Sequence, residues 1–183
     1  MRVLAFAGSL RSGSLNRRLL AVAVETLRGK AEVDLLDLRE VPMPIYDGDL
    51  EASDGLPEGA KRFRQRIAAA EALLIVTPEY NNSIPGGLKN AIDWASRRPD
   101  QPFKGKPVLL LSASPGPFGG VRSVMALRLS LASLMAVVIP NTVSVGRADQ
   151  AFDESGALKD PKQRQSVEHA CAELLRFTAA LKG

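Results

Sequence analysis

The chain has 183 residues, of which 45% are hydrophobic and 24% charged, and its formal net charge is +4. A chain of this length can bury roughly 70% of its unfolded surface. One α/β domain over residues 1–183 therefore needs neither disulfides nor metals, and the single cysteine, Cys171, excludes an internal disulfide. The charge is too small and scattered to indicate nucleic-acid binding, and no apolar run approaches the roughly 18 residues that span a membrane. We therefore expect a cytoplasmic protein without nucleic-acid or membrane partners.

Short apolar runs alternate along the chain with segments of helical periodicity. The first run, at 2–7, is uninterrupted and ends at Gly8, which is typical of a buried parallel strand. In chain order the sequence predicts a strand at 2–7, a helix at 15–28, a strand at 32–37, a helix at 57–70, a strand at 72–77, a helix at 86–95, a strand at 108–113, a helix at 121–135, a strand at 137–145 and a helix at 160–181. Residues 38–57, rich in Pro, Gly and Asp, are predicted to form a long loop with at most a partial turn.

Strands that alternate with helices predict a doubly wound parallel sheet with helices on both faces. Ligands of such sheets bind beyond the carboxyl ends of the strands, where the strand order reverses. The three loops of most unusual composition, at 8–16, 77–86 and 114–120, each follow a predicted strand directly. We therefore expect these loops to meet at one edge of the sheet and to form the binding site.

The loop at 8–16 has the composition of an anion-binding site. It leads into a helix whose N-terminus offers unpaired N–H groups and a partial positive charge. Arg11 supplies a guanidinium suited to phosphate oxygens. Four further side chains add hydroxyl or amide donors: Ser9, Ser12, Ser14 and Asn16.

Several interpretations of this loop compete. Gly8 and Gly13 have the glycine spacing of a P-loop, but Ser14 and Leu15 stand where that motif has Lys and Ser or Thr. The G-x-G-x-x-G fingerprint of dinucleotide-binding folds is absent from residues 8–16. A single phosphate monoester, such as that of FMN, fits best, and a helix capped by Ser or Asn after an ordinary turn is the alternative.

Two motifs in this order carry a resemblance to a known family. Gly8 to Asn16 reads GSLRSGSLN, and Pro78 to Asp93 reads PEYNNSIPGGLKNAID. Together they resemble the NADPH-dependent FMN reductase family, which includes bacterial quinone, chromate and azo-dye reductases. The likeness is closest to the quinone and chromate reductase branch, and it weakens after about Val145.

The resemblance implies a flavodoxin-like fold with strand order 2-1-3-4-5, and it assigns cofactor contacts to all three loops. The family cradles the FMN phosphate with the first loop, which corresponds here to Ser9, Arg11, Ser14, Leu15 and Asn16. The second loop wraps the isoalloxazine ring, which corresponds to Pro78, Glu79, Tyr80 and Asn81, with Ile84 close by. The third loop lies beside the ring and contributes Ser114 and Gly116, while Pro117 departs from the small residue typical of the family. For Glu79 a solvated turn position without side-chain contact is an equal alternative.

We expect FMN as cofactor and NADPH or NADH as electron donor. Hydride transfer to flavin N5 needs alignment and exclusion of water but no side-chain nucleophile, so no catalytic acid or base is assigned. A ping-pong cycle would then reduce an acceptor at the same place. Quinones suit a flat slot lined by Tyr80, Pro115 and Phe118, and chromate, azo compounds and free flavin are further candidate acceptors. His169 and Cys171 lack the neighbours of a metal site.

The helix predicted at 121–135 is apolar on two stripes, whereas a surface helix of a monomer needs only one buried face. The first stripe comprises Val121, Val124, Leu127, Leu131 and Leu134, and the second Met125, Leu129, Ala132 and Ala136. This pattern predicts a homodimer or homotetramer formed through the helix, or else a helix buried within its own domain. Two rival functions stay open at this point, a flavodoxin-type electron carrier and a flavin-bound redox sensor.

Overall fold

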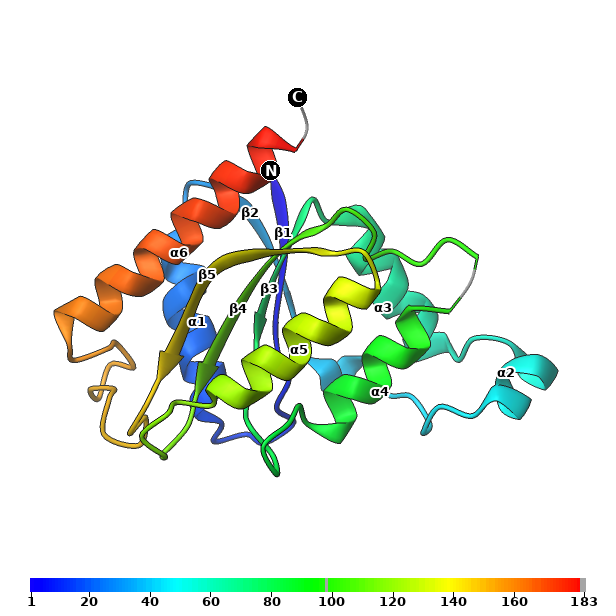
Figure 1. Cartoon of the computed structure of the whole chain (residues 1–183), viewed down its shortest axis with the longest axis horizontal. Coiled ribbons are helices and arrows are strands. Elements are labelled where there is room, and N and C mark those ends of the chain that lie inside the picture. The colour runs from blue at the N-terminus through cyan, green and yellow to red at the C-terminus, as the bar shows by residue number, and fades with distance from the viewer. Residues whose placement is uncertain (98, 182–183) are drawn as a thin grey trace.

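The computed structural model describes residues 1–97 and 99–181. Its centre is a parallel sheet of five strands in the order β2-β1-β3-β4-β5, which confirms the predicted topology. The strands are β1 (Arg2–Ala7), β2 (Glu32–Leu36), β3 (Ala72–Val76), β4 (Pro107–Ala113) and β5 (Val137–Val145). All five point the same way, so their carboxyl ends meet at the lower edge of the sheet in Figure 1.

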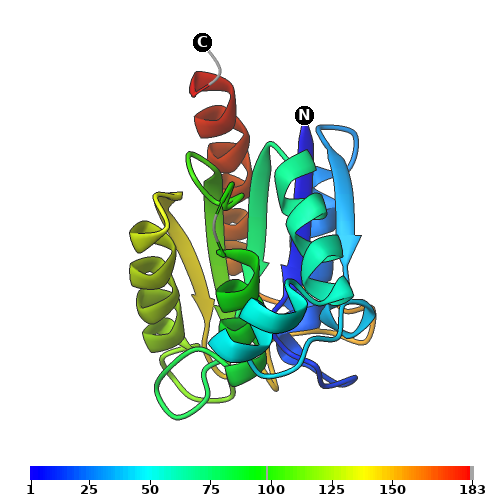
Figure 2. The ribbon, with the colours of Figure 1, turned by 90° about the vertical axis from the view of Figure 1, so that its right-hand side faces the viewer.

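Helices cover both faces of this sheet (Figures 1 and 2). The α-helices of the described residues are α1 (Leu15–Leu27), α2 (Gly48–Asp54), α3 (Glu58–Ala69), α4 (Gly86–Ala95), α5 (Val121–Ser133) and α6 (Pro161–Ala180). Figure 2 shows α3 and α4 in front of the sheet, α5 at its left beside β5, and α6 behind it. None of the helices within the described residues is both long and apolar enough to cross a lipid bilayer.

Two hydrophobic cores follow from the alternation of side chains along the inner strands. On one face, Val3, Leu74 and Leu109 pack under α1 and α6. On the other face, Leu4 and Ile75 pack under α3, α4 and α5. Every residue of β3 and β4 is buried, which is why these strands are continuous apolar runs in the sequence.

The prediction of a loop throughout residues 38–57 was wrong. A 3-10 helix forms at Leu38–Glu40, and α2 occupies Gly48–Asp54. No residue of α2 is buried, so no apolar stripe could reveal it in the sequence. A side-chain cap begins the helix, because Asp47 accepts a hydrogen bond from the Asp49 N–H at 2.8 Å.

The segment before α2 is anchored to α4 through the carbonyl of Pro44. This oxygen accepts hydrogen bonds from Trp94 Nε1 at 2.9 Å and from Asn90 Nδ2 at 2.8 Å. Tyr46 packs edge-on against the Trp94 ring, with the ring centroids 4.9 Å apart. The connection between β2 and α3 is therefore ordered by contacts that are distant in sequence.

Candidate functional site

The loops that follow β1, β3 and β4 lie together at the carboxyl edge of the sheet, at the bottom of Figures 1 and 2. They belong to the three adjacent strands at the centre of the sheet. The Gly8 N–H donates to Val76 O at 2.8 Å, and the Thr77 N–H donates to Leu111 O at 2.9 Å, so the strand ends are held level. The topology therefore brings together the three segments that the sequence singled out.

The first loop presents donors around an open turn. Ser14 is the N-cap of α1, and its hydroxyl accepts the Asn16 N–H at 3.2 Å. Ser9 and Ser14 are buried, whereas Arg11 is exposed, and no described residue forms a hydrogen bond or ion pair with the Arg11 guanidinium. A side chain at Gly13 would meet no atom within 4 Å, so this turn faces open space. The loop thus combines a helix N-terminus with a cation that has no partner among the described residues.

Asn16, at the start of α1, uses its side-chain amide for hydrogen bonds within the protein. Its Nδ2 donates to Ala113 O at 2.9 Å, and its Oδ1 accepts from Ala113 N at 2.9 Å. Ala113 lies beyond the last residue of β4 that pairs with β3. The side-chain amide of Asn16 therefore takes the hydrogen-bonding position beside Ala113 that a further residue of β3 would occupy. These two hydrogen bonds join the first loop to the start of the third loop. Because they occupy both polar atoms of the amide, they do not support the prediction that this amide contacts the cofactor.

The second loop is a tight hairpin. Tyr80 and Ser83 exchange two backbone hydrogen bonds of 3.0 Å each, and Asn81 and Asn82 between them have φ angles of 49° and 62°. Two central residues with positive φ define a type I′ turn, which Asn tolerates better than most residues. The Tyr80 side chain is 44% exposed at the edge of this hairpin, while Ile84 packs against the core beneath α4.

The third loop packs closely on the segment after β5. The Ser114 hydroxyl accepts the Gly116 N–H at 3.2 Å, and Gly116 O accepts the Arg147 N–H at 3.1 Å. A Cβ at Gly146 would lie 2.3 Å from Pro117 O, so only glycine fits there. The absence of a side chain at Gly146 therefore lets the backbone of the third loop lie against the segment after β5, whichever side chain stands at position 117.

Glu79 turns its carboxylate toward α5. Its Oε2 accepts the Arg122 N–H at 3.1 Å, and its Oε1 pairs with Arg122 Nη1 at 3.1 Å. The sequence offered no signal for Arg122, because an arginine in the first turn of a helix is unremarkable in itself. The two glycines before α5, Gly119 and Gly120, were the available hint that the helix lacks a capping side chain of its own.

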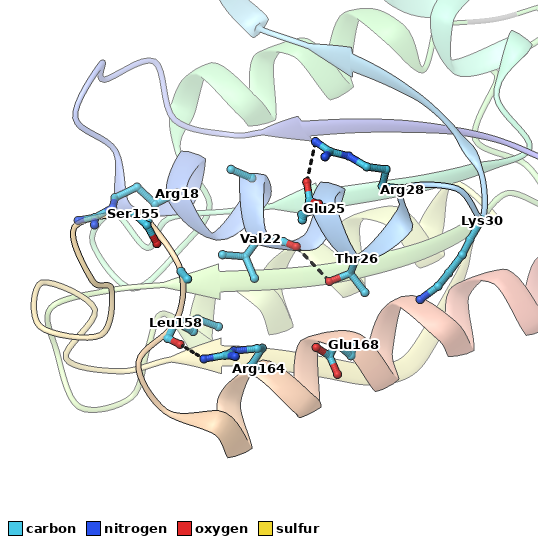
Figure 3. A pocket seen from close by; sticks show the side chains of 13 residues that line it. Arg18, Val22, Glu25, Thr26, Arg28, Lys30, Ser155, Leu158, Arg164 and Glu168 are labelled. Atoms are coloured by element: carbon cyan, nitrogen blue, oxygen red, sulfur yellow. Dashed lines mark hydrogen bonds and ion pairs between the residues drawn. The ribbon is translucent and has the colours of Figure 1, made fainter.

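A groove of about 670 Å³ lies away from these loops, between α1 and the start of α6 (Figure 3). Its arginines are engaged within the chain: Arg18 with Asp153 O at 3.0 Å, Arg28 with Glu25 at 2.7 Å and Arg164 with Leu158 O at 3.0 Å. In this respect they differ from Arg11. The first loop therefore differs from this groove in offering an arginine that has no partner among the described residues.

Cys171 is buried and His169 is exposed, both on α6. The described residues contain no group of three or more His, Cys, Asp or Glu side chains that could hold a metal ion. Burial raises the pKa of the Cys171 thiol to about 12. The thiol is consequently protonated at neutral pH and unsuited to nucleophilic chemistry.

The donors at the carboxyl edge fit a phosphate monoester that is attached to a flat ring. The free Arg11 guanidinium and the N-terminus of α1 suit the phosphate. The hairpin of the second loop and the exposed Tyr80 and Phe118 side chains suit an aromatic ring system. FMN has both parts.

Comparisons with known proteins agree with this geometry. The profile of the NADPH-dependent FMN reductase family matches residues 1–150. An NAD(P)H-dependent FMN reductase from Pseudomonas aeruginosa is 42% identical over 184 residues, covering 100% of this chain and 98% of the relative. A quinone reductase from Escherichia coli K12 is 43% identical over 183 residues, covering 97% and 93%.

A solved structure shares the architecture. The flavoenzyme NAD(P)H:acceptor oxidoreductase FerB from Paracoccus denitrificans superposes with a TM-score of 0.86 at 32% identity, covering 98% of this chain and 97% of that one. The match to the family profile covers both sequence motifs, since it spans residues 1–150. The chain belongs to the NADPH-dependent FMN reductase family.

Proposed function

We propose that this protein is a cytoplasmic, FMN-dependent NAD(P)H oxidoreductase that reduces quinones. One observation carries the proposal: three features meet at one edge of the sheet. They are a loop whose arginine has no partner among the described residues, a tight hairpin, and two exposed aromatic side chains. The named relatives, an FMN reductase and a quinone reductase, support the choice of donor and acceptor. Bound FMN would supply the capacity to accept a hydride from a reduced nicotinamide and to pass electrons to the acceptor.

The first loop would hold the phosphate. The Arg11 guanidinium and the N–H groups at the start of α1 offer charge-assisted hydrogen bonds. The buried hydroxyls of Ser9 and Ser14 line the same turn, and the Ser14 oxygen also fixes the turn by accepting the Asn16 N–H. These groups would retain the cofactor rather than take part in chemistry.

The second and third loops would hold the ring and the acceptor. The segment from Pro78 to Asn81 would present backbone groups to one edge of the ring, because its hairpin leaves those of Glu79 outside any ladder. Ser114 and Gly116 would lie beside the ring. Tyr80, which is 44% exposed, and Phe118, which is 62% exposed, would form apolar walls for a planar quinone and exclude water from it.

The exposed face of α5 supports a homodimer or homotetramer. Val124, Leu127 and Leu131 of the helix are buried in the chain's own core, whereas Met125 is 60% and Leu129 is 76% exposed. Most of the first stripe thus forms a core face and most of the second a surface face, although Val121 of the first is exposed and Ala136 of the second packs against the core. We assign the surface face to a second copy of the chain. Replacing Leu129 by glutamate should lower the oligomeric mass measured by light scattering. Leu35, which is 57% exposed on the edge strand β2, is the matched control position for the same substitution.

Anaerobic spectroscopy tests the activity. NADPH should bleach the visible absorption of the FMN-loaded protein, and a quinone should restore it. A flavin that stays oxidised would refute the proposal, and bleaching without steady-state turnover of NADPH would favour an electron carrier.

Replacing Arg11 by alanine tests the phosphate site. FMN affinity should fall roughly 10- to 100-fold, the contribution of one hydrogen bond to a charged group. Arg28→Ala is the matched control, because Arg28 pairs with Glu25 on the exposed face of α1. Equal affinity of wild type and Arg11→Ala would contradict the assignment of the first loop.

A further inference from the structure

Helix α5 begins without a capping side chain of its own. Its N-cap position is Gly120, in a left-handed conformation with φ 86°. A Cβ at this position would also lie 3.2 Å from Ser112 Cβ, which is a close contact with the end of β4. A Ser, Thr, Asp or Asn, which usually caps a helix, is therefore disfavoured here by backbone strain and by a tight contact.

Glu79 supplies the missing cap from the second loop. A capping side chain normally accepts the N–H of the second or third helical residue, and the Glu79 carboxylate accepts the N–H of Arg122 at 3.1 Å. The negative charge also lies at the positive end of the helix. The Glu79 side chain is only 14% exposed, whereas the Arg122 side chain is 50% exposed.

The contact continues through Arg122 to the third loop. The Arg122 guanidinium pairs with Glu79 at 3.1 Å and lies over the Phe118 ring, 5.2 Å from its centroid. Glu79 directly precedes Tyr80 in the chain. The pair consequently links the hairpin that carries Tyr80 to the loop that carries Phe118, the two aromatic residues assigned to the walls of the slot.

We propose that Glu79 and Arg122 form a positioning pair that holds the second and third loops in the relative arrangement that binds the flavin ring and the acceptor. This inference rests on the proposed function. In it, the carboxylate of Glu79 acts on Arg122 and α5, while the backbone of Glu79 faces the cofactor. Neither side chain donates or accepts a proton or an electron.

Three alternatives make different predictions for substitutions. A positioning pair requires that changes at either residue weaken FMN binding and raise the KM for the quinone. A carboxylate that contacts the flavin directly makes only the Glu79 substitution matter. A purely structural cap lowers stability and leaves FMN binding and KM unchanged.

The experiment compares Glu79→Gln, Arg122→Ala and the double variant with wild type. FMN affinity is measured by fluorescence titration of the apoprotein, and the quinone KM and kcat are measured with the loaded enzyme. Urea unfolding of the apoprotein reports stability separately. Glu173→Gln is the matched control, because Glu173 forms an ion pair with Arg176 at 2.7 Å on the surface of α6.

Each single substitution should weaken FMN binding about tenfold, as expected for one charge-assisted hydrogen bond. The double variant should be about as weak as either single variant, because both remove the same interaction. Should Arg122→Ala fail to fold, Arg122→Lys, which keeps the charge but loses the guanidinium fork, should give an intermediate loss.

Unchanged FMN affinity and KM in both single variants would overturn the positioning pair, whatever happens to the urea midpoint. A loss confined to Glu79→Gln would also overturn it, in favour of direct contact with the flavin. Failure of the wild-type protein to bind FMN at all would instead refute the proposed function, so the two failures are distinguishable.

Discussion

Replacing Asn16 by alanine should destabilise the apoprotein by about 2–5 kcal/mol. Asn16 is 3% exposed, and its side-chain amide forms two hydrogen bonds of 2.9 Å with the backbone of Ala113. The substitution leaves a buried N–H and a buried C=O without partners, and each such group costs about 1–3 kcal/mol. Water that enters the space would form hydrogen bonds with these two groups and recover part of the cost. The expected loss of stability is therefore smaller than the summed maximum cost of the two groups.

Urea unfolding of wild-type and Asn16→Ala apoprotein, followed by circular dichroism, measures this difference in the free energy of unfolding. The matched control is Gln150→Ala, an exposed amide that should change the free energy by less than about 0.5 kcal/mol. If Asn16→Ala lost no more stability than the control variant, the conclusion that Asn16 satisfies the backbone of Ala113 at the end of β4 would be refuted. FMN should leave the difference unchanged if the variant binds it as tightly as wild type, and should widen the difference if the substitution weakens FMN binding.

Three further predictions concern the rest of the chain. Gly146→Ala should displace the third loop and weaken FMN binding in a fluorescence titration, because the new Cβ would lie 2.3 Å from Pro117 O; unchanged binding would show that the loop adjusts freely. The pKa of Asp37 lies below its ordinary value of 3.8, chiefly through a hydrogen bond from Arg39, so its contribution to stability is present at neutral pH and is lost as the pH falls below about 4. Asp37→Asn should therefore unfold at lower urea than wild type at pH 7, and the gap between the two midpoints should narrow on acidification rather than widen. Cys171, whose pKa burial raises to about 12, should react with iodoacetamide only after unfolding, and rapid labelling of the native protein at pH 8 would contradict its burial.

Local sequence patterns were sufficient for the strands and most helices. The apolar runs of β3 and β4 are buried on both faces, and the periodicity of α1 and α3 reflects one buried face each. The order of strands followed from the resemblance to a known family. Helix α2 escaped prediction because it buries no side chain, and its position depends on Pro44 and Trp94, which are 50 residues apart.

The residues at the candidate site divide in the same way. The first loop predicts an anion site, because Arg11, Ser14 and its glycines have suitable chemistry and precede a helix. The partners of Asn16 and Glu79 could not be predicted, because Ala113 and Arg122 lie 97 and 43 residues away in the chain.

By itself, the sequence determined the strands, the helices that bury an apolar face, the three loops and the cofactor class, because backbone propensity, hydrophobic periodicity and motif chemistry act over a few neighbouring residues. Only the tertiary structure decided which polar side chains are engaged within the chain and which of them hold the loops together. Those assignments depend on distances between segments that the sheet brings into contact, and no local pattern contains them.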